Sequence, residues 1–188
     1  MSVRNALLAI LTIGPAYGFQ LHGELASRTA GRRSVNAGQI YGTLDRLIRQ
    51  DVVESAGATP DGLPLYRLTR SGRAEALDWL HRTDSSPGEE WSDLLDRVLI
   101  ASSLPEVDAM TVVAAYREYW EAVGARNPPS VSGQDRLAAQ AGLSLANAAL
   151  AWLDEVETHI VSDDEGALSR VFDTDKPRRG RPPAVPVG

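Results

Sequence analysis

Cysteine is absent from this 188-residue sequence, so the chain has neither a disulfide nor a thiolate metal site. No apolar run approaches the roughly 20 residues that a membrane-spanning helix needs. The N-terminal residues show neither a basic stretch nor a small-residue cleavage motif, which predicts a cytoplasmic protein without a signal peptide or a membrane partner. The three histidines have no metal-ligand spacing, and there is no glycine-rich phosphate loop or nucleophile elbow. We therefore expect no metal, no cofactor and no enzymatic activity.

Acidic residues prevail overall, with a formal net charge of −6, but the charge is unevenly distributed. Residues 1–82 carry ten arginines against seven acids, whereas residues 83–175 carry five arginines against eighteen acids. Residues 176–188 carry four cations and no acid. A uniformly acidic protein would be a poor partner for nucleic acid, and this asymmetry makes the two basic ends candidates for binding DNA.

Hydrophobic periodicity predicts four helices and one β-hairpin in the first 82 residues. The helices are expected over residues 2–13, 17–29, 36–50 and 70–82. The strands are expected over residues 52–55 and 65–68, around a Thr-Pro-Asp-Gly turn. This order predicts a mainly α protein that begins with a winged helix-turn-helix domain over 1–82, in which Thr69 caps the fourth helix.

A polar break at residues 83–90 separates this unit from three further helical patterns. The first begins near Trp91, and the other two are expected over 105–125 and 133–161, so that residues 89–161 form an all-α domain. Apolar residues recur along the last helix at alternating steps of three and four, as in a coiled coil. They predict a homodimer interface made by Leu143, Ala146, Leu150 and Leu153.

The helix from Asn36 to Gln50 has one polar face and one apolar face, as a recognition helix in the major groove requires. The residues expected on the apolar, buried face are Ile40, Leu44, Leu47 and Ile48. Gln39 can read adenine, Thr43 can contact a thymine methyl group, and the two arginines can reach guanine or phosphate. The residues assigned to DNA contacts here are Ser34, Asn36, Gln39, Tyr41, Thr43, Arg46 and Arg49. An ordinary helix with a solvated polar face shows the same pattern, and this alternative stays open from these residues alone.

Three spaced motifs in the first eighty residues resemble those of the PadR family of transcriptional regulators. They are Gly14-Pro15-Ala16-Tyr17-Gly18, Val35-Asn36-Ala37-Gly38-Gln39-Ile40-Tyr41, and Tyr66-Arg67-Leu68-Thr69-Arg70-Ser71-Gly72. The resemblance implies a winged helix that binds promoter DNA as a homodimer. The second half resembles the family only in being helical.

Two departures from the family pattern concern the wing. Asp51 stands where the family usually has glycine between the recognition helix and the wing, and aspartate tolerates the left-handed conformation better than most residues. The expected wing tip has no basic residue. We therefore expect a weak wing contact and assign Arg67 as the wing cation.

The C-terminal segment 173–188 is charged and rich in proline and glycine, which predicts a disordered basic tail. Its core of Arg178, Arg179, Gly180 and Arg181, followed by proline, resembles an AT-hook. Glycine lets such a segment lie on the floor of a narrow A·T minor groove, and the arginines run along it. A basic tail that only improves solubility is the alternative.

Four tryptophans lie on predicted helices, where tryptophan usually belongs to the core. The resemblance implies a second role, because some PadR relatives bind flat aromatic effectors between the domains of the dimer. Trp79, Trp91 and Trp120 are the candidates for such a site.

Together these features predict a cytoplasmic, nucleoid-associated repressor that binds double-stranded DNA as a homodimer and is released by a small aromatic effector. The main alternative is an architectural DNA-binding protein that uses the tail on A·T-rich DNA with little sequence choice. A repressor should prefer its own promoter over random DNA by about 10³-fold or more, and an architectural protein should not. An enzyme or ligand-sequestering protein is disfavoured because no catalytic constellation is present.

Overall fold

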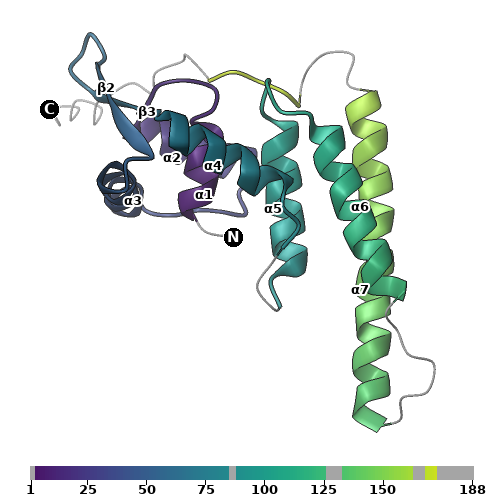
Figure 1. Ribbon diagram of the computed structural model, residues 1–188. Helices are drawn as coiled ribbons and strands as arrows, with labels where there is room; N and C mark the ends of the chain where they lie inside the picture. The colour runs from purple at the N-terminus through teal and green to yellow at the C-terminus, as the bar shows by residue number, and fades with distance from the viewer. Residues whose placement is uncertain (1–2, 85–87, 126–132, 163–167, 173–188) are drawn as a thin grey trace, which may run out of the picture.

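The computed structural model describes residues 3–84, 88–125, 133–162 and 168–172, and its described part is mainly helical (Figure 1). The helices are α1 (Val3–Ile10), α2 (Gly18–Arg28), α3 (Ala37–Arg49), α4 (Arg70–His81), α5 (Glu90–Ser102), α6 (Ala109–Ala125) and α7 (Gly133–Val161). The strands are β1 (Ala16–Tyr17), β2 (Val53–Ala58) and β3 (Pro64–Leu68). No helix among these residues combines the length and apolar character needed to cross a membrane.

The first half is a winged helix, with the three helices, hairpin and fourth helix in the predicted order. The sheet has one strand that the sequence did not predict. The two-residue strand β1 pairs antiparallel with β3, through Ala16 opposite Tyr66, so the strand order is β1-β3-β2. Two residues are too few to show a period, which is why β1 left no pattern.

Two predicted details of the helices are wrong. Ile48 was expected on the buried face of α3 but is 40% exposed, although Ile40, Leu44 and Leu47 are fully buried as expected. Helix α6 begins at Ala109, four residues later than Pro105, because the Asp108 carboxylate accepts a hydrogen bond from the Met110 amide at 3.0 Å and so caps the helix there.

A tight junction joins the end of α3, the wing and the start of α4. Asp51 adopts the left-handed conformation (φ 56°) that its position was expected to need. The Thr69 hydroxyl accepts a hydrogen bond from the Gly72 amide, which confirms the predicted cap, and donates one to the Asp51 carbonyl at 2.9 Å. A Cβ atom on Gly72 would lie 1.9 Å from the carbonyl oxygen of Val52, so only glycine fits there.

The predicted dimer seam on α7 is largely buried inside the chain, against α6, which corrects that interpretation (Figure 1). Ala146 and Leu153 are fully buried, Leu150 is half-buried, and Leu143 remains 39% exposed. Gly124 of α6 lets α7 approach closely, since a Cβ placed on it would lie 3.8 Å from the Ala146 Cβ. A heptad-like pattern shows that a helix face is covered, and here the covering helix belongs to the same chain.

Replacing Gly72 with alanine should destabilise the fold by about 1–3 kcal/mol, because the new methyl group would displace the Val52 backbone. Gly23 is the matched control: it lies within α2 with no atom within 4 Å of an added Cβ, so Gly23→Ala should stabilise by about 0.5–1 kcal/mol. Urea unfolding of both variants measures the difference. Equal stability of the two would contradict the tight junction.

Candidate nucleic-acid interface

Helix α3 presents the predicted recognition face at the outer side of the winged helix. The helix begins where the Asn36 side chain accepts a hydrogen bond from the Gln39 amide at 2.8 Å. Asn36, assigned above to DNA, therefore has a capping role that uses its side-chain oxygen. Ser34 and Gln39 are exposed at this end of the helix, and Arg46 and Arg49 are exposed near its other end.

Thr43 does not belong to the exposed face, and the contact with thymine predicted for it is corrected here. Its side chain is only 2% exposed, and its hydroxyl donates to the carbonyl of Gln39 at 2.7 Å. The same hydroxyl accepts a hydrogen bond from Arg46 Nη2 at 3.0 Å. The Thr43 hydroxyl thus helps to fix the position of the Arg46 guanidinium through this hydrogen bond.

Tyr41 packs α3 onto the start of α2 while remaining 41% exposed. A Cβ on Gly18 would lie 2.4 Å from its ring, so the glycine of the Tyr-Gly motif makes room for this aromatic side chain. Tyr66 of β3 lies nearby. Its pKa is raised, mainly by burial and to a smaller extent by the neighbouring Tyr41 and Asp45. The cluster gives the Tyr41 ring a supported position at the surface.

Arg67, the cation assigned to the wing, is paired with an acid. Its Nε atom lies 2.7 Å from the Glu54 carboxylate, directly across the hairpin, where the two residues are register partners. Both side chains are about half exposed, so the pair is screened by water and adds little stability. The pair nevertheless offsets the positive charge that Arg67 would offer to a phosphate.

Ion pairing of this kind extends over most of the winged helix. Seven of the ten arginines in residues 1–82 lie in ion pairs with an acid of the described structure. The arginines without an ion pair among the described residues are Arg46, Arg49 and Arg70. Two of them lie on α3.

Arg70, which the sequence analysis did not assign to DNA, is exposed at the start of α4 beside the end of α3. The neighbouring hydroxyls of Thr69 and Ser71 both donate to the carbonyl of Asp51, which follows α3 directly. Whether an arginine has an acidic partner depends on the fold. The sequence alone therefore could not distinguish Arg70, which has no such partner among the described residues, from the arginines that are paired.

The turn between α2 and α3 is tied to the helical half by a buried carboxylate, which the sequence analysis also missed. Asp96 of α5 is fully buried and accepts hydrogen bonds from Arg32 Nε at 3.3 Å and Arg33 Nε at 2.7 Å. The two arginines immediately precede the segment that leads into α3. The orientation of α3 therefore depends on a residue outside the winged helix.

The three tryptophans proposed for an effector site have aromatic or cationic neighbours. Trp79 is 8% exposed and lies against the Arg97 guanidinium, 5.3 Å from its ring centre. Trp91 is half-buried and meets Trp152 of α7 edge to face, with ring centres 6.1 Å apart. Trp120 is 2% exposed, in the core. These positions do not form one cluster, because Trp91 faces α7 and Trp79 faces α5.

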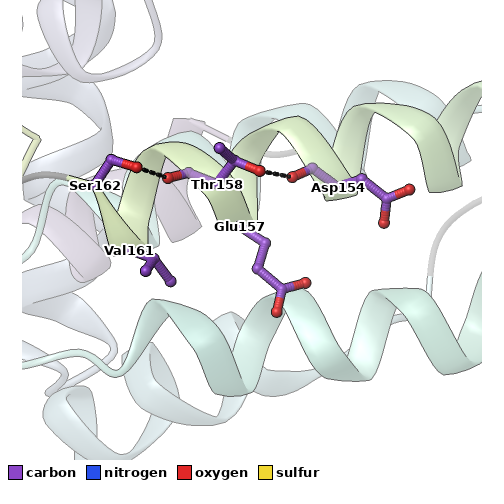
Figure 2. A pocket seen from close by; sticks show the side chains of 5 residues that line it. All are labelled: Asp154, Glu157, Thr158, Val161 and Ser162. Carbon is purple, nitrogen blue, oxygen red and sulfur yellow. Dashed lines mark hydrogen bonds between the residues drawn. The ribbon is translucent and has the colours of Figure 1, made fainter.

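The outer face of the helical half is acidic. Two shallow hollows lie along α6 and α7, and neither is lined by tryptophan. Figure 2 shows the first, on the last turns of α7, where it is lined by Asp154, Glu157, Thr158, Val161 and Ser162. Arg117 bridges the two carboxylates, at 2.8 Å and 3.0 Å. This face would repel a DNA phosphate backbone, which leaves the winged-helix side for nucleic acid.

The tail residues Arg178, Arg179, Gly180 and Arg181 lie outside the described part of the chain. The AT-hook interpretation therefore stays a prediction.

Replacing Asp96 with asparagine should destabilise the protein by about 2 kcal/mol, because Arg32 and Arg33 would then lack a charged partner in a partly buried place. Asp78→Asn is the control, since that carboxylate is 65% exposed and makes a surface pair with Arg82 at 3.5 Å. Thermal unfolding of both variants provides the measurement. If the Asp96→Asn protein were as stable as the control, the ion pairs of Asp96 with Arg32 and Arg33 would not contribute to the stability of the fold.

Residues 7–78 match the model of the family described as "Transcriptional regulator PadR-like family". A comparison with curated proteins finds no match. Among solved structures, Bacillus subtilis PadR in complex with operator DNA is 20% identical, with 82% of this chain and 96% of that chain covered and a TM-score of 0.41. The complex of the same protein with p-coumaric acid is 22% identical, with 85% and 99% covered and a TM-score of 0.40.

A PadR-like regulator from Bacillus cereus is 16% identical, with 87% and 100% covered and a TM-score of 0.38. All three TM-scores are below 0.5. The family match covers the segment that contains all three motifs and the helices of the winged-helix unit up to α4. This part of the chain, which folds as a winged helix, is therefore similar to the PadR-like family of transcriptional regulators.

Proposed function

We propose that the protein is a homodimeric repressor that reads promoter DNA with α3. The observation that carries the proposal is the location of unpaired positive charge, since Arg46, Arg49 and Arg70 have no acidic partner among the described residues. A winged helix offers α3 to the major groove. Arg46, supported by Thr43, is suited to guanine, and Gln39 is suited to adenine.

Tyr41, Ser34 and Arg70 are suited to phosphate contacts, which position the protein without reading sequence. Arg67 belongs to this set only if DNA displaces Glu54, so we rank it lowest. The architectural alternative uses phosphate contacts alone. It predicts a specificity ratio far below the roughly 10³ expected for promoter against random duplex.

Arg46→Ala and Gln39→Ala should each weaken binding to the protein's own promoter by about 1–3 kcal/mol, with no loss of helicity. Binding to random duplex should change less, because base readout contributes only to the specific complex. Arg82→Ala is the matched control: it removes the same charge from a side chain already paired with Asp78 and Asp84. Fluorescence anisotropy on both duplexes gives the ratio, and unchanged promoter affinity in both α3 variants would eliminate α3 as the reading element.

The homodimer is proposed through a different face of α7 from the predicted seam. Helix α7 has 29 residues and α6 has 17, so the first turns of α7 extend beyond α6 (Figure 1). Apolar and small exposed residues recur at steps of four from this extension to the level where α6 ends, namely Leu137, Ala141 and Leu145. They lie on the side of α7 opposite the seam. Leu137 is 62% exposed, and a second copy of this helix would cover the stripe by two-fold symmetry.

A Leu137→Asp, Leu145→Asp double variant should be monomeric, because the two buried carboxylates would lie in the proposed interface. Asn147→Asp is the control, an exposed change of the same charge on the same helix away from the stripe. Sedimentation at micromolar concentration measures the mass. A dimer that persists in the double variant would place the interface elsewhere.

Release by a small aromatic effector is part of the proposal. The supporting observation is that three buried polar atoms have no hydrogen-bond partner among the described residues, namely Arg97 Nε, Tyr116 Oη and Trp120 Nε1. Of these residues, Arg97 and Tyr116 lie close enough to interact electrostatically. The pKa of Tyr116 is raised, mainly by burial, so its hydroxyl stays protonated and can donate a hydrogen bond. A planar acid could satisfy such donors, and p-coumaric acid, bound in one Bacillus subtilis PadR structure, is the first compound to add to the promoter-binding assay. Unchanged affinity across aromatic acids would remove the effector from the proposal.

A further inference from the structure

Thr43 connects the two side chains of α3 that are proposed to read bases. Its hydroxyl donates to the main-chain carbonyl of Gln39 at 2.7 Å, and the same oxygen accepts a hydrogen bond from Arg46 Nη2 at 3.0 Å. The three residues are spaced by four and then three positions, so they follow one stripe of the helix. The Thr43 side chain is only 2% exposed, so its influence on a base must pass through Arg46.

The two hydrogen bonds fix the orientation of the Thr43 hydroxyl. A hydroxyl carries one proton, and giving it to the Gln39 carbonyl leaves the lone pairs of the oxygen for Arg46. Threonine in a helix chooses between two rotamers, and the bond to the carbonyl four residues earlier selects one of them. The acceptor that Thr43 offers to Arg46 is therefore fixed before any DNA binds.

Arg46 keeps the donors that base readout requires. A guanidinium has five N–H donors, and among the described residues Arg46 uses one of them, so four remain for a ligand. Arg49, the other unpaired arginine of α3, differs in its support, because its Nε atom donates to the exposed main-chain carbonyl of Asp45 at 3.3 Å. Arg46 is thus the one of these two arginines that a buried side chain holds.

The bond to Thr43 also sets the position of the guanidinium along α3. An α-helix rises about 1.5 Å per residue, so Thr43 lies about 6 Å along the axis from Gln39, and Arg46 about 10.5 Å. Because Arg46 Nη2 contacts the Thr43 hydroxyl, the guanidinium lies closer to the level of Thr43 than to that of its own Cα atom. Base pairs are about 3.4 Å apart, so this shift reduces the spacing from Gln39 from about three base-pair steps to about two.

We infer that Thr43 is a positioning residue, which presets Arg46 for a guanine within about two base-pair steps of the adenine read by Gln39. The inference rests on the proposed reading of DNA by α3 and specifies the arrangement of bases that α3 prefers. A long arginine side chain loses rotamer freedom when it binds a base, and a guanidinium already held by a buried hydroxyl loses less. The gain belongs to the specific complex, because contacts with phosphate carry no sequence information.

The first test is a double-mutant cycle between Thr43 and Arg46 in the full-length chain. Thr43→Val keeps the branched shape and removes the hydroxyl, whereas Thr43→Ser keeps the hydroxyl. On a footprinted duplex from the protein's own promoter, Thr43→Val should weaken binding by about 2- to 10-fold, the cost of ordering one long side chain. Thr43→Ser should retain most of the affinity, and in an Arg46→Ala background Thr43→Val should have no further effect.

Thr158→Val on α7 is the matched control, and it should leave promoter affinity unchanged. Its hydroxyl donates to the carbonyl of Asp154, four residues earlier, at 2.9 Å, and it accepts no guanidinium among the described residues. Circular dichroism of every variant checks that the helices are intact. Affinity for random duplex should be the same for Thr43→Val and the native chain.

Base analogues identify what the pair reads. In the promoter duplex, 7-deazaguanine and 7-deazaadenine, placed one at a time, remove the N7 acceptor of the base that they replace. One guanine should matter to the native and Thr43→Ser proteins, less to Thr43→Val, and not at all to Arg46→Ala. The adenine to which Gln39→Ala is insensitive should lie within about two base-pair steps of that guanine.

Equal weakening by Thr43→Val with and without the Arg46 side chain would mean that the hydroxyl only supports the helix, and would overturn the inference. So would a Thr43→Val protein with native promoter affinity and native helicity, or a guanine and an adenine about three or more steps apart. These outcomes leave the proposed function standing if the native chain prefers its promoter. A native chain without that preference would instead overturn the proposed function, and this inference with it.

Discussion

The buried carboxylate of Asp96 is the constraint on which the arrangement of the two halves depends. A charge with no exposed surface is stable only while its partners face it, and here the partners are Arg32 and Arg33 at the turn into α3. On the other side of the same turn, Arg28 is buried against Ser103 and the main-chain carbonyls of Arg170 and Val171. The α2–α3 turn is therefore held from two directions by groups of the helical half.

This arrangement suggests how an effector would act on the recognition helix. Arg97 follows Asp96 on α5, so one residue faces the Trp79 and Tyr116 group while its neighbour holds the α2–α3 turn. A ligand that binds better to one position of Arg97 would select the corresponding position of α5, and with it that of the turn. The path is short because Asp96 and Arg97 are consecutive residues of α5.

Much of the fold could be predicted from periodicity, because a helix of this length repeats its pattern several times. The bounds of α7 and the order of the winged helix follow from that repetition. Periodicity shows that a face is buried but not what covers it, so Ala146 and Leu153 were assigned to a partner chain when α6 covers them. The buried acid Asp96 interrupts the apolar pattern of α5, and its arginine partners lie more than sixty residues away, where no local pattern can indicate them.

The exposed polar face of α3 lies where the sequence predicted it, but the sequence could not show which arginines of the winged helix are paired with acids. Counting charges over residues 1–82 treats every arginine alike, whereas folding pairs most of them with acids from other segments. Within the described part of the chain, the arginines of the winged helix that remain without an acidic partner are Arg46 and Arg49 on α3 and Arg70 at the start of α4. Ion pairs within the protein thus concentrate the attraction for DNA on a few side chains, and a phosphate must compete with Glu54 for Arg67 but meets no such rival at Arg46. Each unpaired cation raises the affinity for any duplex, whatever its sequence. Reading bases requires only a few side chains in fixed positions, so pairing the other arginines with acids favours specificity.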